Sequence, residues 1–220
     1  MNKPFIRLDS LASKMETSHA TEVFSKWALM GKDEGMEKGH YQSVKAMLDL
    51  AIPQIQENFT AIDLGCGNGW VVRLLKDLGS VHAEGVDGSV EMVKKAKSID
   101  ATGKYTQGLL PDWKPETDFD LVHSMEFLYY LKDPKEMLKQ IQSNWLKENG
   151  ILVAGVDHYL ENEESLTWPK YVGVHMTTMS KSEWRDAMED AGFQDVEIHQ
   201  VAAKGDFPGT LVMIGRNRAV

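Results

Sequence analysis

The sequence has little cysteine, fewer positive than negative charges and no long apolar run. Its single cysteine, Cys66, excludes an internal disulfide framework, a cysteine-based zinc site and an iron–sulfur cluster. The longest aliphatic run, 151–156, is far shorter than a membrane span, and residues 1–21 lack the continuous apolar stretch of a secretory signal. We therefore expect a protein of the reducing cytoplasm that does not associate with membranes.

The charge balance disfavours nucleic acid as a partner. Lys and Arg number 24 against 33 Asp and Glu, a formal charge of −9, and such a surface repels phosphate backbones. The one dense basic group, Lys94, Lys95 and Lys97, falls on a short predicted helix and is typical of a solvated helix face. A small-molecule partner is therefore expected, whereas the oligomeric state does not follow from the sequence.

Short β-like runs alternate with helical patterns from about residue 59 to residue 156, which indicates a parallel sheet wrapped by helices. A helix opened by Asp133-Pro134 is expected to end at Asn149-Gly150. Ser180 and Glu183 form a capping-box pattern at the start of a later helix. The last two predicted strands have no helix between them and should pair antiparallel. The predicted strands cover residues 60–64, 81–86, 105–110, 119–124, 151–156, 196–201 and 211–214.

Two stretches do not follow this alternation. Residues 1–58 precede the first strand and contain two helical patterns, so we predict an N-terminal helical cap. Residues 157–179 form a long, aromatic-rich connection, which favours a lid-like insert. Both are expected to close over the edge where the parallel strands end and where ligands bind. Residues 59–220, including the insert, are predicted to form one domain with the cap.

The strongest motif is a glycine-rich turn that follows a strand and opens a helix, Asp63-Leu64-Gly65-Cys66-Gly67-Asn68-Gly69. Its glycines let a ligand approach the backbone, and the helix N-terminus offers free N–H groups. A dinucleotide site would have a third glycine where Trp70 stands, and the indole blocks a pyrophosphate. An aminoacyl carboxylate and amine fit this loop better. Asp63 is expected either to fix the loop through backbone N–H groups or to attract a cationic amine.

A second acid ends the next strand. Asp87, 24 residues after Asp63, is placed to accept hydrogen bonds from both hydroxyl groups of a ribose. Met92, one turn into the following helix, is placed to pack on an adenine ring. Together the two motifs predict a nucleoside-containing ligand at the edge of the sheet.

These residues resemble the class I S-adenosylmethionine-dependent methyltransferase family. The resemblance covers about residues 55–216 and includes Leu110-Pro111, Phe119–Val122 and Asn149–Leu152 besides the two motifs. It implies an α/β, Rossmann-like fold with a mostly parallel seven-stranded sheet of order 3-2-1-4-5-7-6, strand 7 antiparallel, and helices on both faces. It also implies S-adenosylmethionine as cofactor and S-adenosylhomocysteine as product. The implied cofactor-binding residues are Asp63, Gly65, Cys66, Gly67, Gly69, Asp87, Gly88, Met92, Gly108, Leu109 and Ser124.

The chain departs from the family pattern at the adenine end of the site. Family members often carry an acid near the end of strand three, where this sequence reads Thr106-Gln107-Gly108-Leu109. Adenine recognition is therefore expected from backbone groups around Gly108 and Leu109 or from the Gln107 side chain.

Two residues are candidates for catalysis. Glu126 follows the fourth strand, where the transferred methyl should point, and can anchor an amine or act as a general base; the alternative is an exposed acid at a helix start. His158 directly follows the fifth strand and can reach an acceptor. Cys66 is expected to be a small buried loop residue, because no base partner for a nucleophile is implied.

Two further histidines remain open as site residues. His40 can cap the cofactor and His175 can reach the acceptor from the insert. No metal is predicted, because the histidines lack the spacing of a metal triad. Trp27, Trp168, Tyr159 and Tyr171 are typical of core or lid packing, with a cation–π role as the alternative.

The resulting hypothesis is an S-adenosylmethionine-dependent methyltransferase that acts on a small molecule by in-line methyl transfer. Two alternatives stay open. One is a nicotinamide-dependent oxidoreductase on a similar fold, which Trp70 disfavours. The other is a non-catalytic protein that binds S-adenosylmethionine only.

Overall fold

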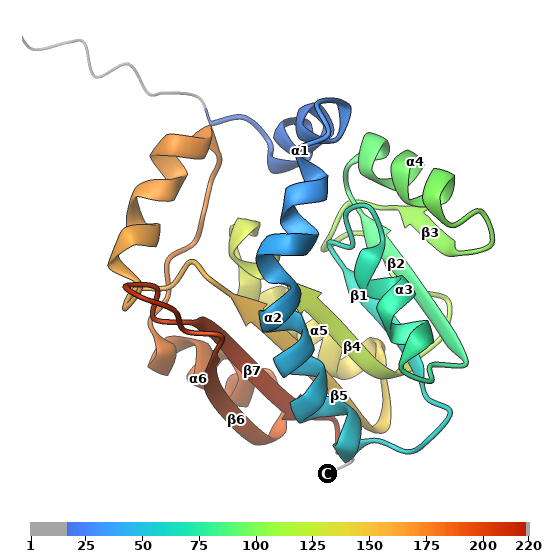
Figure 1. Cartoon of the computed structure of the whole chain (residues 1–220). Coiled ribbons are helices and arrows are strands. Elements are labelled where there is room, and N and C mark those ends of the chain that lie inside the picture. Colours follow the sequence, from blue (N-terminus) through green and yellow to red (C-terminus); the bar gives the residue numbers. More distant parts are fainter. Residues whose placement is uncertain (1–16, 219–220) are drawn as a thin grey trace, which may run out of the picture.

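Seven strands form one sheet in the order β3-β2-β1-β4-β5-β7-β6 in the computed structural model, which describes residues 17–218 (Figure 1). Strand β7 runs antiparallel to both β5 and β6, and the other pairings are parallel. This order and this antiparallel strand confirm the prediction. The strands are β1 Thr60–Leu64, β2 His82–Asp87, β3 Lys104–Gln107, β4 Phe119–Met125, β5 Leu146–Val156, β6 Gln194–Val201 and β7 Thr210–Arg216.

Helices cover both faces of the sheet. Helices α2, α3 and α4 share one apolar cluster with one set of strand residues, and α5 and α6 share another with the opposite set (Figure 1). In β1, for example, Ala61 faces the first cluster and Ile62 the second, as the alternation of side chains along a strand requires. The helices are α1 Ala20–Leu29, α2 Asp33–Ala51, α3 Trp70–Asp77, α4 Val90–Ile99, α5 Pro134–Asn144 and α6 Lys181–Asp190, with short helical turns η1 Ile52–Gln54, η2 Leu128–Tyr130, η3 Glu163–Thr167 and η4 Pro169–Gly173.

Helix ends follow the sequence signals in α6 but not in α5. The capping box at the start of α6 is present, with the Ser180 side chain accepting from the Glu183 amide and the Glu183 carboxylate accepting from the Ser180 amide. Helix α5, in contrast, ends at Asn144 instead of Asn149-Gly150. The apolar pattern continues past this end because Leu146 already belongs to β5 and pairs with Phe119 of β4. Asn149 then lies within β5 at φ +64°.

The predicted N-terminal cap contributes to the sheet's main core. Val44, Met47 and Leu48 of α2 are fully buried and belong to the same cluster as Leu121 of β4. Helix α1 contacts α4, and it lies near the ends of the strands (Figure 1). Residues 1–16 of the predicted cap lie outside the described residues.

The 157–179 insert contacts the rest of the chain at several places. Its Tyr159 and Val174 side chains are fully buried. Ser18, before α1, forms a parallel bridge with Val174, and its amide donates to the Gly173 carbonyl at 3.0 Å. The segment before α1 and the insert therefore lie side by side. No helix among residues 17–218 is long and apolar enough to cross a membrane.

Candidate functional site

The turn between β1 and α3 is held by the neighbouring strand β2. The amides of Gly65 and Cys66 donate to the Val86 carbonyl at 2.9 and 3.1 Å. Gly65, at φ +70°, has no room for a side chain, because a Cβ atom there would lie 2.8 Å from Cβ of Phe127. Gly67, at φ +52°, faces open space, with only the Met92 sulfur at 4.0 Å from such an atom. A ligand can therefore approach the Gly67 backbone closely.

Asp87 at the end of β2 joins the two sequence motifs. Its Oδ2 accepts from the Gly67 amide at 2.9 Å and its Oδ1 from the Ser89 amide at 2.7 Å. Burial raises the pKa of Asp87 to about 6, although the two amide hydrogen bonds act in the opposite direction. Each carboxylate oxygen keeps lone pairs for further donors, as a ribose-binding acid requires.

Asp63 is paired with a histidine that sequence reasoning missed. Oδ1 of Asp63 lies 2.7 Å from Nδ1 of His123 on β4, and both side chains are buried. Burial raises the pKa of Asp63, and the charge and hydrogen bond of His123 oppose this rise. Among the described residues the side chain of Asp63 has no hydrogen bond to the loop; Asp87 holds the loop instead. The register of the two strands reveals the pair, since Asp63 and His123 are direct neighbours on β1 and β4.

A second buried acid fixes the loop from the N-terminal side. Asp33, at the first position of α2, is 1% exposed; it accepts from the Asn68 side chain at 2.9 Å and from Nζ of Lys95 on α4 at 2.8 Å. Breaking either contact would leave a buried carboxylate short of a partner, which costs free energy of folding. The two contacts therefore hold α2, the glycine loop and α4 together. Sequence reasoning missed Asp33, since no local pattern links residues so far apart.

Two cavities adjoin at this edge of the sheet. The larger one, about 650 Å³, is lined by Asp87, Gly108 and Leu109 and also by residues 17–21 and Tyr130. Its size is within the range of small-molecule sites, roughly 300–1,000 Å³. The smaller one, about 50 Å³, lies beside Asp63. Both share the lining residues Met36, Gly65, Gly67, Met92, Met125 and Glu126.

The structure brings most of the predicted site residues to these cavities and leaves three outside. Gly69 lines neither cavity; it is the N-cap residue before α3 and lies beside the Tyr105 ring, at φ +78°. Ser124 is buried, and its hydroxyl points to the Leu64 carbonyl at 3.5 Å. His158 is fully buried, with one ring nitrogen on the Ser165 carbonyl at 3.0 Å and the other on the Thr178 hydroxyl at 2.8 Å. The predicted residues that line a cavity are Asp63, Gly65, Cys66, Gly67, Asp87, Gly88, Met92, Gly108, Leu109 and Glu126.

Three other predicted features can be placed as well. Cys66 is buried at 3% exposure, and burial raises the pKa of its thiol, which fits the expected loop-packing residue. His175 lines the larger cavity and His40 the smaller one. The Gln107 side-chain amide donates to the Gly88 carbonyl at 3.3 Å, and this hydrogen bond links the end of β3 to the turn after β2.

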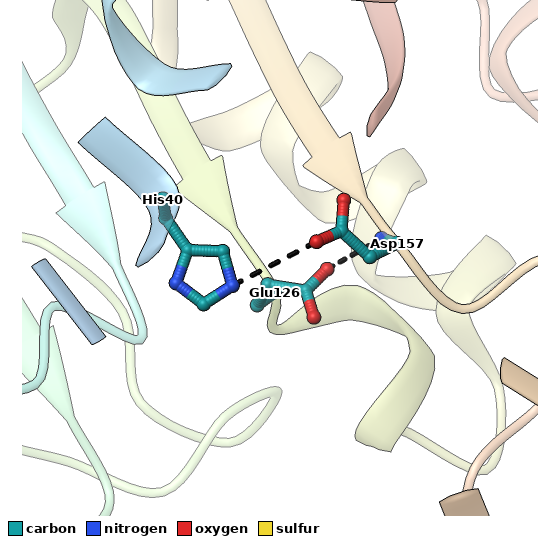
Figure 2. A group of neighbouring side chains, drawn as sticks. All are labelled: His40, Glu126 and Asp157. Carbon is teal, nitrogen blue, oxygen red and sulfur yellow. Dashed lines mark hydrogen bonds and ion pairs between the residues drawn. The ribbon is translucent and has the colours of Figure 1, made fainter. Parts of the chain in front are cut away.

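Glu126, Asp157 and His40 form one group beside the shared lining (Figure 2). Glu126 follows β4 at φ +57°, and its carboxylate accepts from the Tyr129 hydroxyl at 2.7 Å and from the Asp157 amide. Oδ1 of Asp157 accepts from Thr210 at 2.6 Å, and its Oδ2 lies 3.7 Å from Nε2 of His40. Burial, followed by the charge of Asp157, raises the pKa of Glu126.

This group bears on the predicted absence of a metal. One ligand atom from each of its three residues lies within 4.8 Å of the others, which is close enough for one cation. The spacing of histidines along the sequence does not reveal such a group, because two of its three members are carboxylates. The predicted absence of a metal therefore stays a prediction.

Comparison with known proteins agrees with this geometry. The family described as "Methyltransferase domain" matches residues 36–198. A malonyl-[acyl-carrier protein] O-methyltransferase from Halalkalibacterium halodurans is 29% identical over 159 residues, 64% of this chain and 58% of its own length. The chain thus spans little more than half of that relative.

Solved structures match a larger part of the chain. A Haloferax volcanii protein, solved in complex with the Trm112 methyltransferase activator, is 32% identical with a TM-score of 0.79, covering 89% of this chain and 98% of its own. The N-methyltransferase NodS from Bradyrhizobium japonicum, solved with S-adenosyl-L-homocysteine, shares the fold at 17% identity and a TM-score of 0.61, covering 83% of this chain and 87% of its own.

Proposed function

We propose, from the premise that this chain belongs to the methyltransferase-domain family, that it transfers a methyl group from S-adenosylmethionine to a small-molecule acceptor. The observation that carries the proposal is the contact between the Asp87 carboxylate and the Gly67 amide at 2.9 Å. The Asp87 carboxylate and the open Gly67 backbone lie on the same cavity wall, which supports a ribose-binding role for the acid. The Trp70 indole stands where a dinucleotide site would have its third glycine, which disfavours the nicotinamide alternative.

We assign different residues of the chain to different parts of the cofactor. We infer that Asp87 accepts hydrogen bonds from the ribose, that Gly65 and Gly67 face the aminoacyl end, and that backbone groups at Gly108 and Leu109 border the adenine. Bound S-adenosylmethionine supplies an electrophilic methyl group on sulfur. The protein aligns the acceptor with that methyl and keeps water away, and Glu126, which lines both cavities, is in reach of the acceptor.

The segments at the cavity mouth fit a closing role. We infer that residues 17–21 and His175 of the 157–179 insert cover the bound ligands, because both line the larger cavity and the two segments are bridged at Ser18 and Val174. Helix α2 belongs to the core, so within the predicted cap the closing role falls to the segment around α1.

Thermal unfolding in the presence of ligands tests the cofactor assignment. S-adenosylmethionine or S-adenosylhomocysteine at about 100 times its dissociation constant should add roughly 2.7 kcal/mol to the free energy of unfolding. NAD in parallel should add nothing. A shift with NAD alone would contradict the proposal. Release of S-adenosylhomocysteine over a panel of acceptors then separates an enzyme from a protein that only binds the cofactor.

A protein partner is a second element of the proposal. The Haloferax volcanii relative was solved with the Trm112 methyltransferase activator, and the match covers 89% of this chain. We infer that this chain can bind an activator of the same kind. Co-expression of the tagged chain with a Trm112 protein should give a complex that survives gel filtration, and separate elution of the two proteins would contradict this inference.

A further inference from the structure

We propose that the methyl acceptor is an amine that enters as an organic cation, held by the Glu126 carboxylate and the aromatic rings of Phe24 and Tyr130. This inference rests on the proposed function and names its substrate class. Three features of the cavity carry it: carboxyl groups with no lysine or arginine partner, a carboxylate oxygen with room for another donor, and aromatic walls.

The first feature is charge. Within residues 17–218, no lysine or arginine forms an ion pair with Glu126 or Asp157; His40 lies 3.7 Å from Asp157, and the Tyr129 hydroxyl donates to Glu126. Elsewhere in the site the chain does supply such partners, as Lys95 does for Asp33. Desolvation raises the pKa of both carboxyl groups, and a cation that binds beside them favours their charged form.

The second feature is the hydrogen-bonding character of the group. Nδ1 of His40 lies 2.8 Å from the Met36 carbonyl, which can only accept, so that nitrogen carries a proton. The other ring nitrogen, Nε2, lies 3.7 Å from Asp157 Oδ2, which is wider than a direct hydrogen bond (Figure 2). Oδ2 of Asp157 therefore has room for a hydrogen bond from another donor. An alkylammonium group brings three N–H donors to such a place.

The third feature is the aromatic wall. Phe24 and Tyr130 line the larger cavity together with Phe127 and Glu126. The rings of Phe24 and Tyr130 meet edge to face, with centroids 5.3 Å apart. Ring faces beside a carboxylate bind organic cations, because the ring quadrupole and the apolar surface both favour them. A hydrated metal ion gains little from such walls.

The lining also disfavours an anionic acceptor. Among the described residues, the larger cavity has four carboxylates, one lysine, Lys132, and no arginine. Recognition of a carboxylate usually employs arginine, whose fork matches it bidentately. We therefore infer a different acceptor from the malonyl group named for the Halalkalibacterium halodurans relative.

The proposed reaction consists of one proton transfer followed by one methyl transfer. Glu126 accepts a proton from the ammonium group, which leaves a neutral amine with its lone pair. That lone pair forms the nitrogen–carbon bond to the methyl group while the carbon–sulfur pair returns to sulfur. The products are an N-methylammonium ion and S-adenosylhomocysteine. Positive charge thus moves from sulfur to nitrogen, where the ring faces of Phe24 and Tyr130 stabilise it.

Calorimetry on the S-adenosylhomocysteine-saturated protein tests the inference without relying on turnover. The probes are butylamine, phenethylamine and tryptamine, each compared with the alcohol and the carboxylate that carry the same chain. At least one amine should bind roughly tenfold or more tightly than both of its counterparts. Its incubation with S-adenosylmethionine should yield the N-methyl product by mass spectrometry.

Matched variants locate the contact. Glu126→Gln should weaken binding of that amine roughly tenfold or more and leave the alcohol and S-adenosylhomocysteine within about twofold. Glu189→Gln, the same change at an exposed site on α6, should alter none of these affinities. Phe24→Leu, which keeps apolar bulk but removes the ring, should weaken the amine more than the alcohol.

The outcomes separate this inference from the proposed function. If S-adenosylhomocysteine does not bind the wild-type protein, the proposed function fails and this inference fails with it. If it binds but no amine is preferred, only the inference is overturned. The same holds if Glu126→Gln abolishes S-adenosylhomocysteine binding, which would place Glu126 on the aminoacyl end. Acceptor binding that requires Mn²⁺ or Zn²⁺ and disappears with EDTA would overturn it in favour of a metal at this group.

Discussion

Asp63 and His123 lie side by side on β1 and β4, and their side chains form a hydrogen bond of 2.7 Å beneath the glycine loop. Asp63 also lines the smaller cavity. The pair therefore connects the sheet's interior with the floor of the site. Because both groups are removed from water, each depends on the other for its hydrogen bond.

Replacing His123 tests this dependence. His123→Ala leaves the Asp63 carboxyl group buried without its partner and should lower the free energy of unfolding by about 3 kcal/mol in urea titrations. His199→Ala, which removes a partly exposed pair with Glu197 on the edge strand β6, should cost less than about 1 kcal/mol. Equal losses in the two variants would show that the buried pair has no special role.

The Asp87 carboxylate should determine cofactor affinity. Asp87→Ala removes the acceptors for both ribose hydroxyls and the anchor of the Gly67 amide, so S-adenosylhomocysteine should bind roughly 100-fold more weakly. Asp77→Ala, at an exposed site in the last turn of α3, should leave the affinity unchanged. Calorimetric titration measures both. An unaltered affinity in Asp87→Ala would refute the ribose assignment.

Two glycines that both have positive φ should respond differently to alanine. At Gly65, a Cβ atom would lie 2.8 Å from Phe127, whereas at Gly79 nothing lies within 4 Å. Both have positive φ, so Gly79→Ala should cost only the backbone strain, about 1 kcal/mol. Gly65→Ala should cost that strain plus displacement of Phe127, and it should also weaken S-adenosylhomocysteine binding. Urea titration and calorimetry separate the two effects, and equal stability losses would contradict the steric argument.

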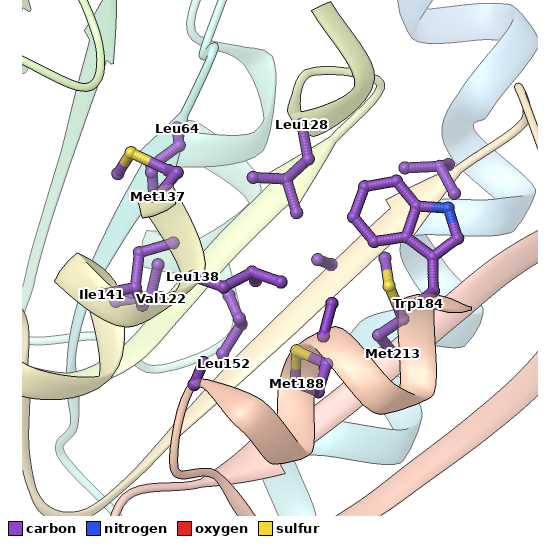
Figure 3. Packing of buried hydrophobic residues seen from close by; sticks show 14 of the residues in the cluster. Leu64, Val122, Leu128, Met137, Leu138, Ile141, Leu152, Trp184, Met188 and Met213 are labelled. Atoms are coloured by element: carbon purple, nitrogen blue, oxygen red, sulfur yellow. The ribbon is translucent and has the colours of Figure 1, made fainter. Parts of the chain in front are cut away.

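The core between the sheet, α5 and α6 is closely filled, as Figure 3 shows for Leu152 and its neighbours. Leu152 of β5 is fully buried, so Leu152→Ala should lower the free energy of unfolding by roughly 2–5 kcal/mol. Leu160→Ala, at a side chain that is 50% exposed, is the matched control and should cost less than about 1 kcal/mol. Similar losses would mean that the site near Leu152 collapses around the smaller residue.

Local sequence patterns predicted the elements that depend mainly on interactions between residues close together in the sequence. Thr60–Leu64 was predicted as a strand with the bounds the structure has, and the Ser180–Glu183 capping box is formed. The end of α5 was wrong, because an apolar run of Trp145 and Leu146 fits a helix as well as a strand until β4 is available as a partner. Choosing between the two required a contact with Phe119, which is distant in sequence.

The same distinction between local patterns and distant contacts applies to the site residues. The glycine loop and Asp87 form a contiguous pattern and could be recognised, whereas Asp33 reaches Asn68 only through the packing of α2 on the sheet. His158 follows β5 as predicted, but other residues of the insert occupy both of its ring nitrogens. Nδ1 lies at hydrogen-bond distance from the Ser165 carbonyl, and Nε2 from the Thr178 hydroxyl. Placing a side chain at a strand end therefore did not predict its partners.

The pH dependence of cofactor binding should follow Asp87, whose pKa burial raises to about 6. Because folding raises this pKa above its ordinary value of 3.8, folding favours the protonated form relative to the unfolded chain, and this group's contribution to stability is lost as the pH rises toward about 6. A ribose donates to the carboxylate, so ligand binding favours the opposite form. The affinity for S-adenosylhomocysteine should therefore fall below about pH 6, approaching tenfold per pH unit.

Asp87→Asn distinguishes this titration from that of the other buried acids. Its affinity should be lower throughout and should change much less between about pH 5 and pH 7.5, because the amide does not titrate in this range. Any slope that remains in the variant belongs to groups such as Asp63 and Glu126, whose pKa values burial also raises. A variant with the same slope as the wild type would show that Asp87 is not the acid that binding deprotonates.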